Sequence, residues 1–256
     1  DPEGEQDLIR AGIELAPGKL VTSARRVISG DVTKTAAFRE GRFIIQDEAS
    51  QLVALMVGEA STILDCCAAP GGKTRILAER NPTAQITAMD LHPHRARLLR
   101  RLVRASNVSV VTGDVVNFPL GTLYKLVLVD APCSGTGTLA RNPEIKWRLT
   151  VEDIADLRSR QLAILQSAMK AVGPGGRLIY STCSLEPEEN SEVLEEALVF
   201  DPSFRLISSR ELVQGLQAAG ALQQQNIDSL VSGPYLRTLP GIHACDGFFA
   251  AVLEKI

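Results

Sequence analysis

Two cysteines of this chain stand beside polar residues rather than only among the apolar residues that buried thiols usually contact, and the first of them lies in a glycine-rich loop. Cys133 lies in DAPCSGTG (130–137), and Cys183 lies in STCS (181–184) just before a predicted helix. A thiol at a helix N-terminus has a lowered pKa and is a better nucleophile. Either thiol alone is more often structural. Together with the Asp130 carboxylate, they could add sulfur to carbon 6 of a pyrimidine, activate carbon 5 toward a methyl donor and stabilise the adduct near N3.

A third segment, DCCAAPGGKT (65–74), is typical of a loop that holds a nucleotide-like ligand. A strand-like run ends there, small residues follow and a helical pattern begins. Glycines permit close backbone approach, and a helix N-terminus offers free N–H groups to a carboxylate or phosphate. A P-loop requires glycine where Cys67 stands, and the dinucleotide fingerprint G-x-G-x-x-G is absent. The loop therefore indicates another mode of nucleotide binding, with a plain strand-to-helix turn as the structural alternative.

Two further acids follow predicted strands. Asp90 stands 25 residues after Asp65 and is placed to accept hydrogen bonds from ribose hydroxyls. Asp114 follows the next strand and could accept from an adenine amino group. The structural alternatives are a helix-capping aspartate at position 90 and a turn aspartate at position 114.

The elements that must position these residues alternate along the chain. Strand-like apolar runs occur at 62–66, 85–90, 108–112, 124–130, 176–183 and 247–254. Helical patterns occur at 46–58, 73–80, 93–105, 151–172 and 187–199. Thr150 and Asp153 resemble a capping box at the start of the longest helix. Short apolar strands alternating with helices predict a buried parallel sheet in an open α/β domain, whose ligands bind at the carboxyl ends of the strands.

Composition excludes several other classes. The 256 residues are 45% hydrophobic and 22% charged, which argues against disorder and a coiled coil. No apolar run is long enough to span a membrane. The net charge of −3 argues against a wholly basic nucleic-acid coat protein. Five cysteines and three histidines without metal-ligand spacing predict no metal site and a reducing, cytoplasmic location.

The chain is expected to have two parts. Residues 1–45 read as a few short strands and turns with too little apolar sequence for a core, and we expect a remnant of an N-terminal RNA-binding subdomain. Residues 46–256 form the expected catalytic domain. The start at Asp1 rather than Met suggests a piece of a longer protein.

At the motifs described above, the sequence resembles RNA cytosine-5 methyltransferases of the Nop2/Sun (Fmu) type, and the resemblance covers residues 42–256. The matching motifs are DCCAAPGGKT (65–74), AMD (88–90), GD (113–114), DAPCSGTG (130–137) and STCS (181–184). Supporting stretches are QDEASQ (46–51), RNPEIKW (141–147), PEEN (187–190) and LPGIHACDGFF (239–249). One departure is the pair Cys66-Cys67 where a single cysteine is usual, and Cys66 is expected to pack in the strand.

The resemblance implies a Rossmann-like, class I S-adenosylmethionine-dependent methyltransferase: an α/β fold whose mostly parallel, seven-stranded sheet has helices on both faces, plus a small N-terminal α+β remnant. Lys73 would lie near the carboxylate of the cofactor. Asp90 would hold the ribose with Arg95 alongside, and Asp114 would meet the adenine. The residues implied to bind S-adenosylmethionine are Cys67, Ala68, Ala69, Pro70, Gly71, Gly72, Lys73, Asp90, Arg95, Asp114 and Asp130.

For catalysis, the resemblance implies Cys183 as the nucleophile on carbon 6, Cys133 as the residue that assists release, and Asp130 between cofactor and base. Cytosine-5 DNA methyltransferases instead use a Pro-Cys cysteine, which here is Cys133. Cys183 is preferred because the match is to the RNA enzymes and because it precedes a helix.

RNA is the expected partner, most directly 16S rRNA, since the resemblance is greatest to members that methylate it. A tRNA cytosine, or a silent RNA-binding module in ribosome assembly, are the alternatives. Residues 91–104 hold five arginines and no acid, although a solvated helix face together with cofactor contact is the favoured explanation of them. Arg141, Lys146, Trp147 and Arg148 could border the RNA, with Trp147 as a core or stacking residue. We expect a monomer without metal or membrane contact.

Overall fold

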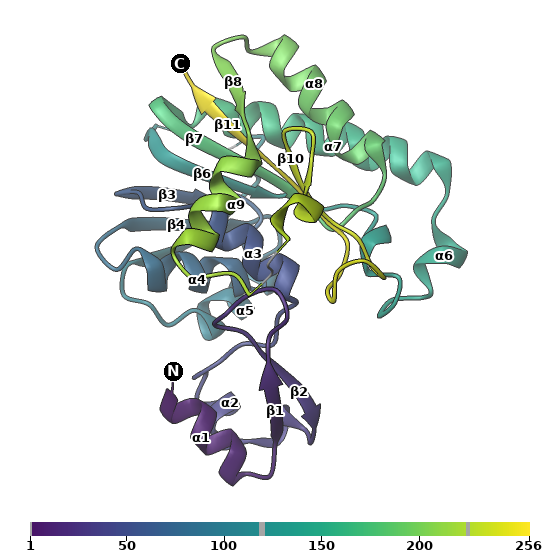
Figure 1. Ribbon diagram of the computed structural model, residues 1–256. Helices are drawn as coiled ribbons and strands as arrows, with labels where there is room; N and C mark the ends of the chain where they lie inside the picture. Colours follow the sequence, from purple (N-terminus) through teal and green to yellow (C-terminus); the bar gives the residue numbers. More distant parts are fainter. Residues whose placement is uncertain (1, 118–120, 224–225) are drawn as a thin grey trace.

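The computed structural model describes residues 2–117, 121–223 and 226–256 and has one dominant sheet (Figure 1). The strands pair in the order β5-β4-β3-β6-β7-β11-β10-β9. The pairs from β5 to β7 are parallel, and β11 runs antiparallel to β7. The bounds of these main strands are β3 (Thr62–Asp65), β4 (Gln85–Asp90), β5 (Val108–Thr112), β6 (Tyr124–Asp130), β7 (Val172–Thr182) and β11 (Phe248–Lys255).

The sheet contains nine strands within the described ranges, and the expected number of seven was wrong. Two short strands share the outer edge of β11: β10 (Tyr235–Thr238) pairs with its first half and β8 (Phe204–Ile207) with its second half. Strand β9 (Val231–Ser232) then pairs with β10. These strands are too short for a clear alternating pattern, which is why the sequence did not predict them.

Side chains alternate between the two faces of the sheet, as the period of a β-strand requires. Leu126 and Leu128 face one apolar cluster, whereas Val127 and Val129 face the other. Helices α3 (Glu48–Met56), α4 (Gly72–Arg80) and α9 (Ser209–Ala218) contribute to the first cluster. Helices α7 (Val151–Lys170) and α8 (Ser191–Phe200) cover the second. Burial on both faces explains the continuously apolar strands, and the predicted α/β fold is confirmed.

The expected helix around residues 151–172 is confirmed, with a change at its end. Thr150 and Asp153 form the predicted capping box, in which the Asp153 N–H donates to Thr150 Oγ1 at 3.2 Å and the Thr150 N–H donates to Asp153 Oδ2 at 2.9 Å. The helix ends at Lys170, and β7 begins at Val172. Residues 173–175, which lie between the expected helix and the expected strand, are inside β7, where the register with β6 is irregular.

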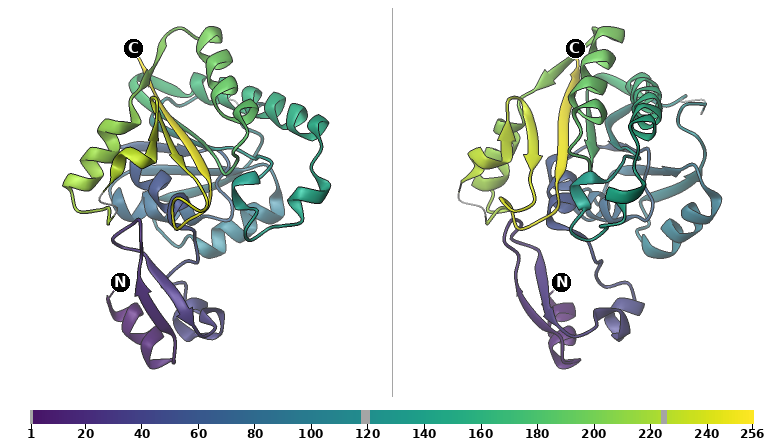
Figure 2. Two further views of the ribbon diagram at one scale, coloured as in Figure 1. Left: turned by 45° about the vertical axis from the view of Figure 1, so that its right-hand side comes forward. Right: turned by 90° about the vertical axis from the view of Figure 1, so that its right-hand side faces the viewer.

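The N-terminal residues form a small unit below the sheet in Figures 1 and 2. Its elements are α1 (Pro2–Arg10), β1 (Glu14–Pro17), β2 (Arg25–Ser29), η1 (Val32–Lys34) and α2 (Ala36–Arg39). Contrary to the expectation of strands and turns without a core, Leu8 lies in a helix and forms a small buried cluster with Ile13 and Val32. The segment around Val21 instead joins the main core, because the buried Glu48 carboxylate accepts the N–H groups of residues 19–21.

Candidate active site

The candidate residues form one row along the carboxyl edge of the sheet. Asp114 follows β5, Asp90 ends β4, the loop 66–71 follows β3, Asp130 ends β6, and Cys183 follows β7. Because these five strands are parallel neighbours in this order, their ends lie side by side. The sequence-based expectation that the motifs meet at one edge is confirmed.

The two cysteine sulfurs lie in contact. Cys133 Sγ is 3.3 Å from Cys183 Sγ, and both thiols are partly buried. Strands β6 and β7 bring them together, since Asp130 pairs directly with Ser181 in the parallel register and each cysteine lies a few residues beyond that pair. Two sulfurs at this distance can share a proton.

The surroundings distinguish the two thiols. A hydrogen bond with Cys133 lowers the pKa of Cys183, and the nearby Lys73 ammonium acts in the same direction, against burial and the Asp130 charge. The same hydrogen bond, burial and the charges of Cys183 and Glu189 raise the pKa of Cys133 well above its ordinary value. These surroundings favour Cys183 over Cys133 as the sulfur that carries the negative charge when the pair loses one proton.

Asp130 joins the thiol pair to the cofactor loop. Its Oδ1 accepts from Ser181 Oγ at 2.8 Å, and its Oδ2 accepts from Lys73 Nζ at 2.7 Å. Lys73 is only 8% exposed; it also donates to Ser50 Oγ at 2.7 Å and lies 5.1 Å from the centre of the Phe248 ring. Lys73, which follows the glycine loop, therefore also contacts the Asp130 carboxylate beside the thiol pair.

The loop between β3 and α4 is built for close backbone contact. Gly71 has a φ of 115°, and a Cβ there would lie 2.8 Å from Leu99 Cδ1, so the loop lies directly against α5 (Pro93–Leu102). A Cβ on Gly72 would lie 3.0 Å from the amide of Gln46. Helix α4 begins here without a side-chain cap, which leaves its first N–H groups available to an acidic ligand group.

Ala68, Ala69 and Pro70 form the same loop, which is fixed by a bond from the Ala68 N–H to the Met89 carbonyl at 2.8 Å. Burial raises the pKa of Cys67, so its thiol stays protonated. Cys66 is buried among the apolar residues beneath α7, as expected of a packing residue.

Asp90 and Arg95 lie together as expected. Asp90 is buried, its Oδ1 accepts the His92 N–H at 3.0 Å, and its Oδ2 lies 3.6 Å from Arg95 Nε. Arg95 also donates to the Ala69 carbonyl at 2.9 Å, which connects the end of β4 to the loop. Asp114 follows β5, where its Oδ1 accepts the Val116 N–H and its Oδ2 accepts from the Asn117 amide, and these bonds shape the turn that carries it.

Asp65 received no role from the sequence, yet it lies at the centre of the row. It is buried at the end of β3, and its Oδ2 accepts from Thr74 Oγ1 at 2.7 Å. Its Oδ1 is buried without a hydrogen-bond partner among the described residues. Burial raises the pKa of Asp65 to about 7. An acid that closes a buried strand was the signal that could have singled it out.

These residues fit the cofactor that the resemblance implies. Buried carboxylates at the ends of β3 and β4 can accept hydrogen bonds from hydroxyl or amino groups, and the uncapped α4 N-terminus can receive a carboxylate. Among the residues that the structure describes, no group of three or more His, Cys, Asp or Glu side chains is arranged to hold a metal ion. Within the same ranges, none of the helices combines the length and apolar character needed to cross a bilayer.

The supporting motifs hold the two cysteine loops. Asn190 of PEEN accepts from Thr182 Oγ1 at 2.6 Å and donates to the Ser184 carbonyl at 3.0 Å, on either side of Cys183. The Gly137 N–H donates to the Cys183 carbonyl at 2.9 Å, and a side chain on Gly137 would overlap the Gly247 backbone. In the sequence these motifs stood out only as stretches that support the resemblance, and no contacts were predicted for them.

The basic loop after Cys133 is exposed. Trp147, in α6 (Ile145–Arg148), is 83% exposed, so the core alternative for this residue was wrong. Its ring lies 5.4 Å from Lys146 Nζ. Arg141 pairs with Asp246, whose N–H donates to Asp47 at 3.2 Å, and this connects the loop to the main domain.

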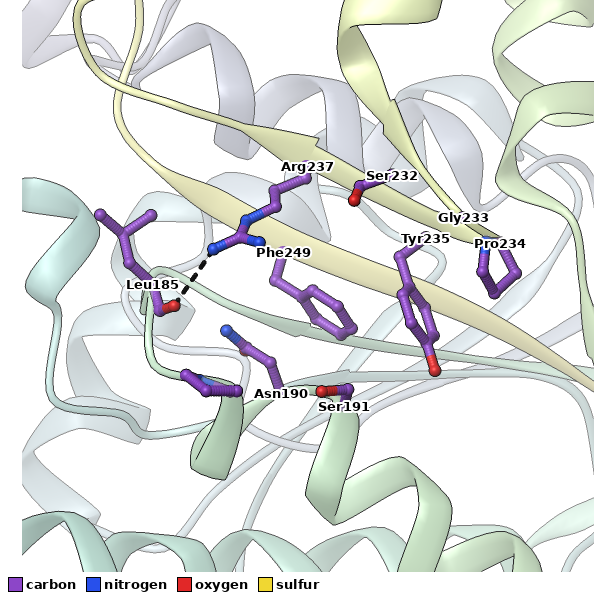
Figure 3. A pocket seen from close by; sticks show the side chains of 10 residues that line it. Leu185, Asn190, Ser191, Ser232, Gly233, Pro234, Tyr235, Arg237 and Phe249 are labelled. Atoms are coloured by element: carbon purple, nitrogen blue, oxygen red, sulfur yellow. Dashed lines mark hydrogen bonds between the residues drawn. The ribbon is translucent and has the colours of Figure 1, made fainter.

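A cavity of about 310 Å³ lies beside the Cys183 loop (Figure 3). Tyr235, Arg237 and Phe249 form one wall, and the Arg237 guanidinium donates to the Leu185 carbonyl at 3.3 Å. The start of α8 forms the other wall. None of the candidate site residues lines this cavity, which is therefore separate from the thiol pair.

The chain is similar to known proteins over most of its length. Residues 52–254 match the family model described as 16S rRNA methyltransferase RsmB/F. The chain is 37% identical over 235 residues to ribosomal RNA small subunit methyltransferase B of Vibrio cholerae, which covers 88% of this chain and 49% of that protein. It is 32% identical over 253 residues to the probable ribosomal RNA small subunit methyltransferase B of Bacillus subtilis, covering 95% and 55%. The chain spans about half the length of these curated relatives.

Solved structures give the same result. The chain is similar to NSun6 from Pyrococcus horikoshii, solved with SFG, with a TM-score of 0.72, 27% identity, and coverage of 91% of this chain and 59% of that one. It is similar to a methyltransferase homolog protein from Pyrococcus horikoshii with a TM-score of 0.75, 26% identity, and coverage of 100% and 82%. These neighbours confirm the methyltransferase fold expected from the sequence. Because the family model spans well over half of its length, the chain belongs to the 16S rRNA methyltransferase RsmB/F family.

Proposed function

We propose that this chain transfers a methyl group from S-adenosylmethionine to carbon 5 of a cytosine in RNA, with 16S rRNA as the substrate. The observation that carries the proposal is the 3.3 Å contact between the Cys133 and Cys183 sulfurs, next to the Asp130 carboxylate. The names of the relatives, small subunit rRNA methyltransferases, support RNA as the substrate class.

In the proposed reaction, the Cys183 thiolate forms a bond to carbon 6, and the electron pair of the 5,6 double bond moves toward carbon 5 and N3. As negative charge reaches N3, a proton from solvent adds there and returns to solvent after methyl transfer. Asp130 accepts a hydrogen bond from this N3–H and so stabilises the adduct. S-adenosylmethionine supplies the methyl group for carbon 5. Cys133 assists release: after its own proton has passed to solvent, its thiolate takes the proton from carbon 5. The 5,6 double bond then re-forms, the bond between Cys183 and carbon 6 breaks, and Cys183 leaves as the thiolate.

The cofactor is proposed to lie along the row from Asp114 to the loop 67–73. Asp90 would accept from the ribose hydroxyls with Arg95 alongside, Asp114 would meet the adenine, and the start of α4 would receive the carboxylate. Lys73 already donates to Asp130 and Ser50, so a contact with the cofactor's carboxylate would have to share that ammonium. All the side chains that act in this scheme belong to one chain, and the cofactor supplies the methyl group. The scheme therefore requires neither a metal ion nor a second copy.

The test uses S-adenosylmethionine with 16S rRNA fragments and, in parallel, with tRNA. The expected product is 5-methylcytosine in the rRNA fragments, located by bisulfite sequencing. Methylation confined to tRNA would show that tRNA, rather than 16S rRNA, is the substrate. Tight RNA binding without methyl transfer would favour the alternative of a non-catalytic ribosome-assembly module.

A further inference from the structure

One buried carboxylate beside the thiol pair has no part in the proposed reaction. Glu189 ends η3 (Pro187–Glu189) and is 0% exposed. Its Oε1 accepts from the Ser134 N–H and from Gln161 Nε2, both at 2.8 Å, and its Oε2 accepts from Ser134 Oγ. Both oxygens of the carboxyl group are therefore held by hydrogen bonds to Ser134 and Gln161. None of the ion pairs among the described residues includes Glu189, whose buried carboxyl group is held by hydrogen bonds.

The partners of Glu189 belong to the backbone that carries Cys133. Ser134 follows the cysteine directly. Gln161, also fully buried, donates to the Pro132 carbonyl at 2.9 Å as well as to Glu189. It therefore holds the residue that precedes Cys133. The Tyr180 hydroxyl donates to the Glu189 carbonyl at 2.7 Å, which connects this turn to β7. Glu189 therefore connects the strand of one cysteine to the loop of the other.

The two sulfurs face different charged groups. The groups that face Cys133 are Cys183, Glu189 and the Tyr180 hydroxyl, and the negative charge of Glu189 contributes to the raised pKa of Cys133. The groups that face Cys183 are Cys133, Asp130 and the Lys73 ammonium, the last of which favours the thiolate. Cys133 thus faces the Glu189 charge without a nearby cation to offset it, whereas Cys183 faces the Asp130 carboxylate together with the Lys73 ammonium that is paired with it.

We propose that Glu189 is a positioning residue that fixes the Cys133 loop against Cys183 and keeps Cys133 in its thiol form. Cys183 is then the thiolate that attacks carbon 6, and Cys133 keeps its proton until the adduct has formed. This inference rests on the proposed cysteine chemistry, but it concerns which sulfur carries the charge and can be tested without RNA or cofactor.

The test is Glu189→Gln, which removes the charge and retains nearly the same shape. The isolated protein is treated with iodoacetamide across a pH series, and alkylation of each cysteine is quantified by mass spectrometry. Alkylation of Cys133 relative to Cys183 is expected to rise by about tenfold, because the thiolate fraction changes tenfold for each pKa unit. Glu195→Gln, an exposed acid on α8, is the matched control and should leave the ratio unchanged.

An unchanged ratio in a folded Glu189→Gln protein would overturn the proposal. If that variant does not fold, Glu189→Asp gives the reverse test: the charge remains on a shorter side chain, so selectivity for Cys183 should persist while methyl transfer slows. Loss of selectivity in Glu189→Asp would also overturn it. Selectivity that depends on Glu189 in a protein that methylates no RNA would reject the proposed function and leave this inference standing.

Discussion

Lys73 Nζ lies 2.7 Å from Asp130 Oδ2, and this contact joins the first turn of α4 to the end of β6. It makes one unit of two motifs that lie far apart in the sequence, the glycine loop and the strand that leads to Cys133. The side chain of Asp130 is 30% exposed, whereas Lys73 is buried. Asp130 is therefore the member of the pair that a bound base can reach.

Lys73→Met should lower both stability and activity. Removing one partner of a buried pair leaves the other charge uncompensated, and partial exposure of Asp130 reduces the expected loss to about 1–3 kcal/mol. Loss of the cation beside Cys183 should also move the rise of activity with pH to higher pH. Denaturant titration and a pH–rate profile measure both effects. Lys34→Met, which removes an exposed pair, is the control; an equal effect in both variants would reject the role of Lys73.

Asp65→Asn should change how stability depends on pH. The folded-state pKa of Asp65 is raised to about 7 from 3.8, so the folded protein holds this proton more tightly than the unfolded chain. The wild type therefore loses stability at about 1.4 kcal/mol for each pH unit between these values, and Asn is neutral throughout. The variant should gain stability relative to wild type as pH rises through this window. A difference that stays constant with pH would contradict this assignment.

Asp90→Asn should weaken binding of S-adenosylmethionine. A hydrogen bond to a charged group contributes about 1.5–3 kcal/mol, so the dissociation constant should rise roughly 10- to 150-fold. Calorimetry with S-adenosylmethionine measures the change, and ATP tests whether the loop binds nucleotides in general. Asp156→Asn, on the exposed side of α7, should bind like the wild type. Unchanged affinity in Asp90→Asn would remove Asp90 from the cofactor site.

Trp147→Ala should weaken RNA binding with little effect on folding, because the side chain is 83% exposed. Stacking of a base on an aromatic ring contributes about 1–3 kcal/mol, which corresponds to roughly a 5- to 150-fold loss of affinity. Fluorescence anisotropy with an rRNA fragment at fixed salt measures it. Val151→Ala, 78% exposed at the start of α7, is the matched control. Equal affinity of the two variants would show that Trp147 does not contact RNA.

Strands and strand ends were predictable from sequence because parallel strands are apolar on both faces and end in abrupt polar motifs, as at Asp130 and Cys183. Their juxtaposition followed from the fold class. The contacts of Lys73 and Glu189 were not predictable, since each joins segments 55 or more residues apart through a side chain whose direction depends on packing. Short edge strands such as β8 also gave no signal, because four residues cannot show a period.

Covalent trapping tests the central claim most directly. Each cysteine variant is incubated with S-adenosylmethionine and 16S rRNA fragments, and protein–RNA adducts are separated on a denaturing gel. Cys183→Ala should give neither product nor adduct, since it lacks the sulfur whose pKa is lowered. Cys133→Ala should accumulate the adduct, because release is impaired. An adduct in Cys183→Ala together with none in Cys133→Ala would reverse the two roles. RNA methylation by the wild-type protein with no adduct in either cysteine variant would contradict the covalent mechanism.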